Sequence, residues 1–244
     1  MRGVWCVFKR EFFDYFATPV AYVFLVAYLV LSGIFTWYLG GLYEQGQANL
    51  LPFFSFQPWL FLALIPALAM RLWAEERRSG TIELLLTLPL TPGQAVFGKF
   101  LSAWAFTGVA LVLTLGEWIT VAWLGGPDHG VVLASYLGTL LLAGGFLAIG
   151  ACLSALTKNQ VVAFVFSISV GFLFILSGFP VVIETARTVL PQRLVELVRE
   201  MSFLTHFNGI TRGVLDARDL VFFVSLITLF LFANTAAVEL KKAD

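Results

Sequence analysis

Residues Gly93 to Lys99 have the spacing of a phosphate-binding loop, because their sequence GQAVFGK fits G-x-x-x-x-G-K. In such loops backbone N–H groups cradle the phosphates, and a Ser or Thr after the lysine holds magnesium. Here Phe100 follows the lysine, no strand is expected before the glycines, and a long apolar run comes next. The sequence therefore predicts no nucleotide site. Lys99 is interpreted as an anchor whose ammonium group reaches lipid headgroups.

Glu117 is the only acidic residue well inside one of the long apolar runs. A carboxylate within a membrane is a candidate functional group by default. A hydrogen bond to a neighbouring Ser, Thr or Trp, or contact with water near the outer mouth, explains it equally well. Both interpretations of this candidate intramembrane polar site stay open.

The histidines and cysteines do not form a catalytic or metal-binding pattern. His129 and His206 lie in connecting segments, and neither is paired with an obvious buried serine, as a serine nucleophile would require. Cys6 and Cys152 are far apart, which makes a structural disulfide improbable and leaves no metal-ligand spacing. We expect no enzyme activity, no metal and no cofactor.

The composition is that of an integral membrane protein. Of 244 residues, 59% are hydrophobic and only 12% charged, against about 25% charged in an ordinary soluble domain. A soluble fold of this length could not bury so much apolar surface. The zero net charge argues against nucleic acid as a partner. The first 19 residues carry too many charged and aromatic side chains for a cleavable signal peptide.

Six apolar runs are long enough to cross a bilayer core of about 30 Å as helices. They do not alternate apolar and polar residues as the strands of a membrane barrel would. The predicted fold is one all-α membrane domain, residues 1–244, with six transmembrane helices. The predicted spans are 20–40, 53–72, 100–124, 131–156, 160–183 and 219–238. Pro66 in the second span and Pro180 in the fifth are expected to kink their helices.

Lys and Arg predict the orientation of these spans. They occur in 1–19, 71–99, 157–159 and the C-terminal tail, whereas the opposite short loops, 41–52 and 125–130, contain none. Both termini and the 71–99 segment are therefore expected in the cytoplasm. Segment 184–218 is an exception to the rule that outer loops contain few basic residues. It is expected outside and yet holds five arginines. They are Arg187, Arg193, Arg199, Arg212 and Arg218.

Two amphipathic regions flank the predicted spans. Before the first span, Trp5, Phe8, Phe12 and Phe16 recur at helical spacing, which predicts a helix lying in the membrane interface; a plain extension of the first span is the alternative. Within 185–215, apolar residues at helical spacing predict one or two helices lying against the outer ends of the spans. They include Leu194, Leu197, Val198 and Met201.

A charged segment between the second and third spans predicts a short cytoplasmic helix over residues 81–88. Ser79-Gly80 precedes it, Thr81 can cap it, and prolines at 89 and 92 end it. Its apolar face is too short to bury itself, so it needs a partner protein or a lipid surface. The face comprises Ile82, Leu85 and Leu86.

The same segment resembles the ABC-2 permease family. The resemblance rests on the pattern Glu76-x-x-x-Gly80-Thr81-x-Glu83-x-Leu85-Leu86-x-x-Pro89, and it covers the whole chain. FKREFFDYFATP near the N-terminus and LTKNQVVAF at 156–164 also fit the family. HFNGITRGVLDARDLVFFVSL at 206–226 is most similar to the gliding-motility branch.

This resemblance implies a subunit of the bacterial inner membrane that pairs with a second permease copy and two cytoplasmic ABC ATPase subunits. It also implies that the pattern above is an ATPase-coupling helix, with Thr157, Lys158 and Asn159 as a second, smaller contact. The gliding-type branch adds an extracytoplasmic auxiliary protein. The expected function is ATP-driven export. The alternative is a membrane scaffold that passes ATPase-driven movement to an outer assembly and translocates nothing.

Overall fold

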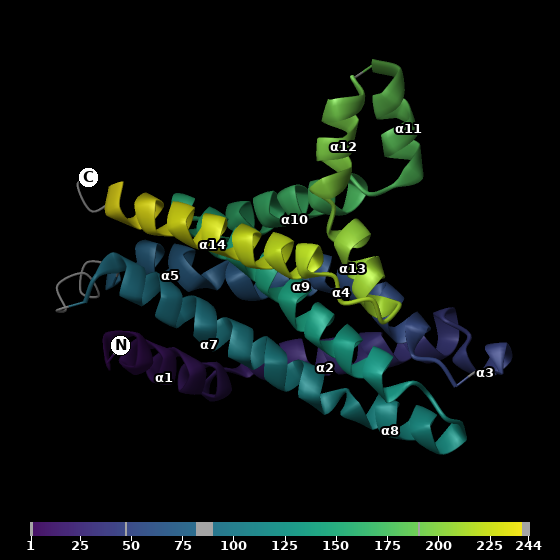
Figure 1. The fold of residues 1–244 in the computed structure, drawn as a ribbon. Coiled ribbons are helices and arrows are strands. Elements are labelled where there is room, and N and C mark those ends of the chain that lie inside the picture. Colours follow the sequence, from purple (N-terminus) through teal and green to yellow (C-terminus); the bar gives the residue numbers. More distant parts are fainter. Residues whose placement is uncertain (1, 47, 82–89, 190, 241–244) are drawn as a thin grey trace.

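The computed structural model describes residues 2–46, 48–81, 90–189 and 191–240, and in these ranges every regular element is helical (Figure 1). The elements are α1 (Arg2–Ala17), α2 (Pro19–Ile34), a π-helical turn (Phe35–Leu39), α3 (Leu42–Gln45), α4 (Leu51–Ala69), α5 (Arg71–Ser79), α7 (Pro92–Leu113), α8 (Leu115–Leu124), α9 (His129–Leu156), α10 (Gln160–Leu176), α11 (Pro180–Val189), α12 (Gln192–Glu200), α13 (Phe203–Thr211) and α14 (Ala217–Leu240).

Among the described residues, five helical segments are long and apolar enough to cross a membrane: Pro19–Leu39, Leu51–Ser79, Pro92–Leu124, His129–Leu156 and Ala217–Leu240. A sixth is obtained if α10 and α11 count together, although they are bent by 77°. The kink expected at Pro180 is therefore confirmed, but it is a break between two helices and not a bend within one helix over 160–183. The helix ends at Leu176, and Pro180 begins a new helix, because proline fits the first helical turn but has no N–H for a helix interior.

Helix α9 forms the centre of the bundle. It contacts α4, α7, α10, α13 and α14, and most of its span is buried. Small side chains on α9 allow these close contacts, as at Gly144, where a Cβ atom would lie 2.9 Å from Ile227 Cδ1. The central helix is thus fixed by packing on several sides.

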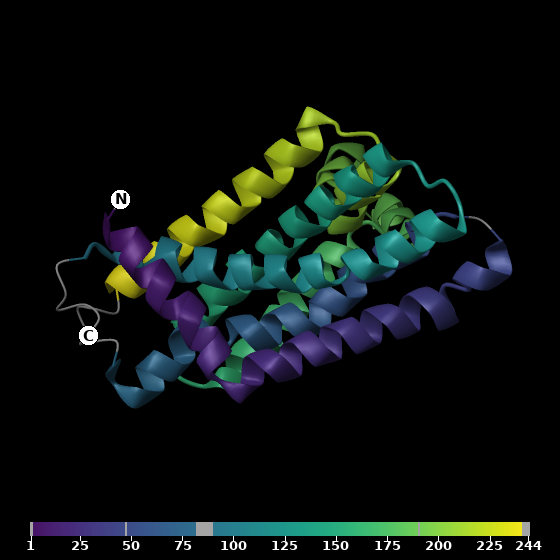
Figure 2. The same ribbon diagram turned by 90° about the horizontal axis from the view of Figure 1, so that it is seen from below.

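Helix α1 is separate from the first span. Thr18 between them has extended backbone (φ −105°, ψ 139°), and Pro19 begins α2. Helix α1 instead crosses α7, as Figure 2 shows, and it contacts that helix closely. The aromatic side chains along α1 stack on one another, with 5.0 Å between the ring centres of Trp5 and Phe8. The alternative of an extended first span is therefore wrong.

The two ends of the bundle differ. Both described ends of the chain, the end of α5 and the start of α7 lie at one end, and α3 lies at the other (Figure 1). Two helices, α12 and α13, lie within 185–215, where one or two were predicted, and α11 begins before this range at Pro180. Pro191 and Ser202 each occupy the position before a new helix. Only α13 packs on α4 and α9; α11 and α12 form a hairpin that stands away from the bundle (Figure 1).

Candidate functional site

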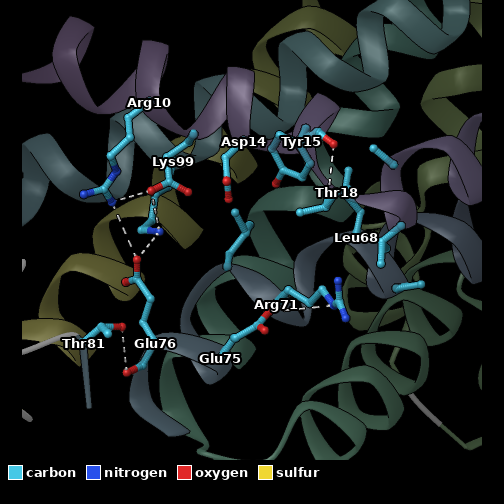
Figure 3. Close-up of a pocket in the computed structure, with 15 residues that line it drawn as sticks. Arg10, Asp14, Tyr15, Thr18, Leu68, Arg71, Glu75, Glu76, Thr81 and Lys99 are labelled. Carbon is cyan, nitrogen blue, oxygen red and sulfur yellow. Dashed lines mark hydrogen bonds and ion pairs between the residues drawn. The ribbon is translucent and has the colours of Figure 1, made fainter. Parts of the chain in front are cut away.

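Four charged side chains meet where α1, α5 and α7 come together (Figure 3). Lys99 Nζ of α7 lies 2.7 Å from Glu76 Oε1 of α5 and 3.1 Å from Glu11 Oε1 of α1. Arg10 Nη2 lies 2.6 Å from Glu11 Oε1 and 3.8 Å from Glu76 Oε1. We call Arg10, Glu11, Glu76 and Lys99 the charged platform. It joins three helices, one of which, α5, leads in the sequence to residues 82–89.

Lys99 is buried in this platform, with only 3% of its side chain exposed. Its ammonium group also lies 5.4 Å from the centre of the Trp73 ring. The interpretation of Lys99 as an anchor among headgroups is therefore wrong. Helix α7 begins at Pro92 and not near residue 100, since Thr91 and Gln94 form a capping box there. Lys99 consequently lies inside the helix, facing α1 and α5.

The platform keeps Glu11 ionised. Burial raises the pKa of this carboxyl, but the charge of Lys99 and hydrogen bonds from Arg10 and Lys99 outweigh it, so the pKa is lowered overall. Gly98, next to Lys99, allows α1 to approach, because a Cβ atom there would lie 2.8 Å from Val7 Cβ. The glycine that suggested a phosphate loop is thus explained by helix packing.

A cavity of about 720 Å³ lies beside the platform (Figure 3). Its polar wall includes Asp14 and the Arg71–Glu75 pair, whose closest atoms are 3.9 Å apart. Its apolar wall includes Leu68 and Leu72. Among the described residues, no group of three or more His, Cys, Asp or Glu side chains is placed to hold a metal ion.

Helix α5 is also fixed to the central helix α9. The helix is interrupted at Met70, between α4 and α5, and the buried Ser154 Oγ of α9 accepts hydrogen bonds from Trp73 N (3.2 Å) and Ala74 N (3.0 Å). The same hydroxyl donates to Met70 O at 2.8 Å. One serine thus forms hydrogen bonds with backbone groups at the interruption between α4 and α5.

Arg77 connects α5 to the second predicted contact. Its Nη1 donates to Ala155 O at 2.7 Å, in the last turn of α9. The following turn holds Thr157, whose hydroxyl accepts from Asn159 N at 3.1 Å, and the exposed Lys158. Asn159 caps α10 by accepting from Val161 N at 2.9 Å. The two segments predicted to contact an ATPase are therefore joined through one arginine.

Apart from the turn at 157–159, the predicted residues fall into three groups. Glu76, Gly80 and Thr81 lie at the platform end; Gly80 has the left-handed φ of 73° that ends α5, and Thr81 Oγ1 lies 2.9 Å from Ser79 Oγ. The structure does not bring Glu117 to this site. The rest of the predicted coupling helix lies outside the described residues: Ile82, Glu83, Leu85, Leu86 and Pro89.

Glu117 lies in the first turn of α8, within the third apolar segment. It is placed to form hydrogen bonds with the hydroxyls of Ser32 and Thr36 in the first span region, while its Oε2 is buried and has no hydrogen-bond partner among the described residues. Nearby polar pairs include Tyr28 with Gln57, at 2.9 Å. The neighbouring hydroxyls favour the hydrogen-bond interpretation and leave a functional role untested.

Sequence reasoning missed the residues that fix this end: Glu11 and Lys99 as partners, Arg77 and Ser154. Only Lys99 gave a usable signal. The Thr91-Pro92 pair predicts a helix start well before it, and a lysine inside an apolar helix needs a carboxylate.

A family model described as "ABC-2 family transporter protein" matches residues 7–238, which is nearly the whole chain. No curated protein sequence matches the chain. The family match and the apolar helices together identify a multi-pass membrane protein, the permease subunit of an ABC transporter. This chain belongs to the ABC-2 family of transporter proteins.

Proposed function

We propose that the chain is the permease of an ABC-2 exporter, driven by ATP that a separate cytoplasmic subunit hydrolyses. Family membership implies ABC ATPase subunits as partners. The observation that carries the proposal is the burial of Lys99 between carboxylates of α1 and α5. Helix α5 is the element that leads in the sequence to the segment expected to meet the ATPase. Such pairing holds α1, α5 and α7 in a fixed arrangement, so that a movement of α5 is passed to the other two helices.

In this proposal, the conformational change of the ATPase acts on residues 82–89, and the resulting movement is transmitted along two routes. One route runs from α5 through Glu76 and Lys99 to α7. The other runs through Ser154 and Arg77 to the central helix α9. Both routes consist of buried or half-buried polar contacts, which hold a defined geometry better than exposed ion pairs do.

The complete transporter in this proposal has two ATPase subunits and two permease copies in a bacterial inner membrane, with both termini cytoplasmic. The shared location of both described chain ends and the end of α5 supports the orientation (Figure 1). The 206–226 segment supports a gliding-type system with an extracytoplasmic auxiliary protein. The permease itself has no catalytic role, and purified alone it should not hydrolyse ATP.

The test replaces Leu85 and Leu86 by Asp and measures co-purification of a co-expressed ABC ATPase. If these leucines are buried on docking, each contributes about 1.5–3 kcal/mol. We expect the L85D/L86D permease to reach the membrane at normal yield and to lose the ATPase. The matched control is L194D/L197D on α12, where both leucines are exposed. Normal retention and stimulation of the ATPase by L85D/L86D would refute the proposal.

A further inference from the structure

A second cavity, of about 660 Å³, lies among α11, α12 and α13, away from the charged platform. Three arginines from three different segments line it: Arg187 in the last turn of α11, Arg199 in the last turn of α12 and Arg212 directly after α13. Glu184 is the one acidic side chain in its lining. We call this the arginine cavity.

The guanidinium groups of these arginines are exposed and free to bind a ligand. None of the three forms an ion pair or a side-chain hydrogen bond with another residue in the described ranges. Positive charges that share one cavity without acidic partners repel each other. A bound anion would offset this repulsion, which no side chain of the described residues does. The cavity therefore has a surplus of positive charge available to a ligand.

The helices that carry the cavity are held in place by polar contacts. His206 Nδ1 lies 2.7 Å from Asp219 Oδ1 in α14, and its Nε2 lies 2.9 Å from Glu200 O at the end of α12. Ser202 Oγ accepts from Leu204 N at 3.1 Å and so caps α13. Because these contacts fix α12 and α13 relative to α14, Arg199 and Arg212 project from a defined frame.

We propose that the arginine cavity binds a phosphate group. Guanidinium groups match the oxygens of phosphate with paired, charge-assisted hydrogen bonds. The exposed Asn208 and the Thr205 hydroxyl, which also line the cavity, add neutral donors. The volume exceeds the needs of one phosphate, and Phe179, Ile183 and Leu204 form an apolar side. The phosphate can therefore belong to a phospholipid headgroup or be a free ion.

This site also explains the exception to the orientation rule. Basic residues are scarce in short outer loops, yet residues 184–218 hold five arginines. Three of them converge on one cavity, and Arg193 and Arg218 do not line it. A ligand that needs positive charge on this face gives a reason for the arginines to be there.

The experiment uses the full chain in detergent with phosphatidylglycerol as the probe, and diacylglycerol with the same acyl chains as the phosphate-free control. Native mass spectrometry measures bound lipid, and inorganic phosphate is added as competitor. We expect R187Q/R212Q to weaken phosphatidylglycerol binding about tenfold or more. R193Q/R218Q removes the same charge from the same segment outside the cavity, and should change binding by less than about twofold.

The two sources of phosphate give different results. Binding of phosphatidylglycerol that inorganic phosphate does not displace identifies a lipid headgroup. Binding of inorganic phosphate alone, measured by calorimetry and lost in R187Q/R212Q, identifies a free ion. If R187Q/R212Q fails to fold, R199Q takes its place. Equal losses in both double variants, equal binding of diacylglycerol, or no binding of either phosphate probe would overturn the proposal.

Discussion

The charged side chains of the platform are paired and, except for Arg10, mostly buried, whereas the arginines of the arginine cavity are exposed and unpaired in the described ranges. In the platform, Lys99 is 3% exposed and lies within 3.1 Å of two carboxylates. In the cavity, three exposed arginines have no acidic partner among the described residues. A charge buried with its partners fixes the geometry of the helices that carry it, whereas an exposed unpaired charge stays available to a ligand.

This contrast assigns different roles to the two ends of the molecule. At the platform end, helices α1, α5, α7 and α9 are joined by side chains that reach between them. At the other end, the α11–α12 hairpin stands clear of the bundle (Figure 1). We infer that the first end transmits movement and that the second recognises a molecule. The predictions below test the first half of this comparison.

The largest effect is expected from removing the central cation of the platform. The K99M variant leaves Glu11 and Glu76 facing each other with most of their side chains buried, at a cost of roughly 3–5 kcal/mol. The measurement is the midpoint of unfolding in detergent. Adding E11Q and E76Q to K99M should recover most of the lost stability, because no buried carboxylate is then left without a cation.

The control for K99M is E75Q, which breaks the exposed Arg71–Glu75 pair. Both residues of this pair lie on α5, the helix that also carries Glu76. At 3.9 Å and with Glu75 54% exposed, this pair should contribute less than about 1 kcal/mol. The comparison between buried and exposed charges fails if K99M costs no more than E75Q.

A smaller effect is expected from S154A, which removes the hydroxyl that bonds the backbone at the interruption between α4 and α5. Two backbone donors, Trp73 N and Ala74 N, then lose their partner in a buried site, at about 1–3 kcal/mol. The unfolding midpoint measures the loss. S169A is the control, because that exposed hydroxyl bonds only Val165 O of its own helix. Equal midpoints for the two variants would show that the junction of α4 and α5 does not need Ser154.

The sequence was sufficient to predict an all-helical membrane protein and most of its spans. Long apolar runs specify helices in a bilayer, because no other partner for the backbone is available there. The separate N-terminal helix also followed from its aromatic spacing and from Thr18-Pro19. These features depend on neighbours in the chain, which is why they could be predicted.

The platform could not be predicted in this way. Glu11, Glu76 and Lys99 are brought together by the crossing of three helices, and nothing in the local sequence of any one helix indicates its partners. The bend between α10 and α11 was predicted only as a kink at Pro180. Val181, Val182 and Ile183 continue the apolar run past this proline, so the sequence did not show that one helix ends and another begins. The coupling role of residues 82–89 stays a prediction.

The smallest effect is expected from pH, through Glu11. Its pKa in the folded protein is lowered from 4.5, so the unfolded chain takes up the proton first as pH falls. The stabilisation by Glu11 is therefore complete above about pH 4.5 and is lost as pH falls through the lower, folded-state pKa. The unfolding midpoint should fall more steeply with acid in the wild type than in E11Q, where this carboxyl is absent. R187Q/R212Q should keep the wild-type slope, because the arginines of the cavity do not contact Glu11. If E11Q kept the wild-type slope, the lowered pKa would contribute nothing to stability, and the platform would be no better paired than the cavity.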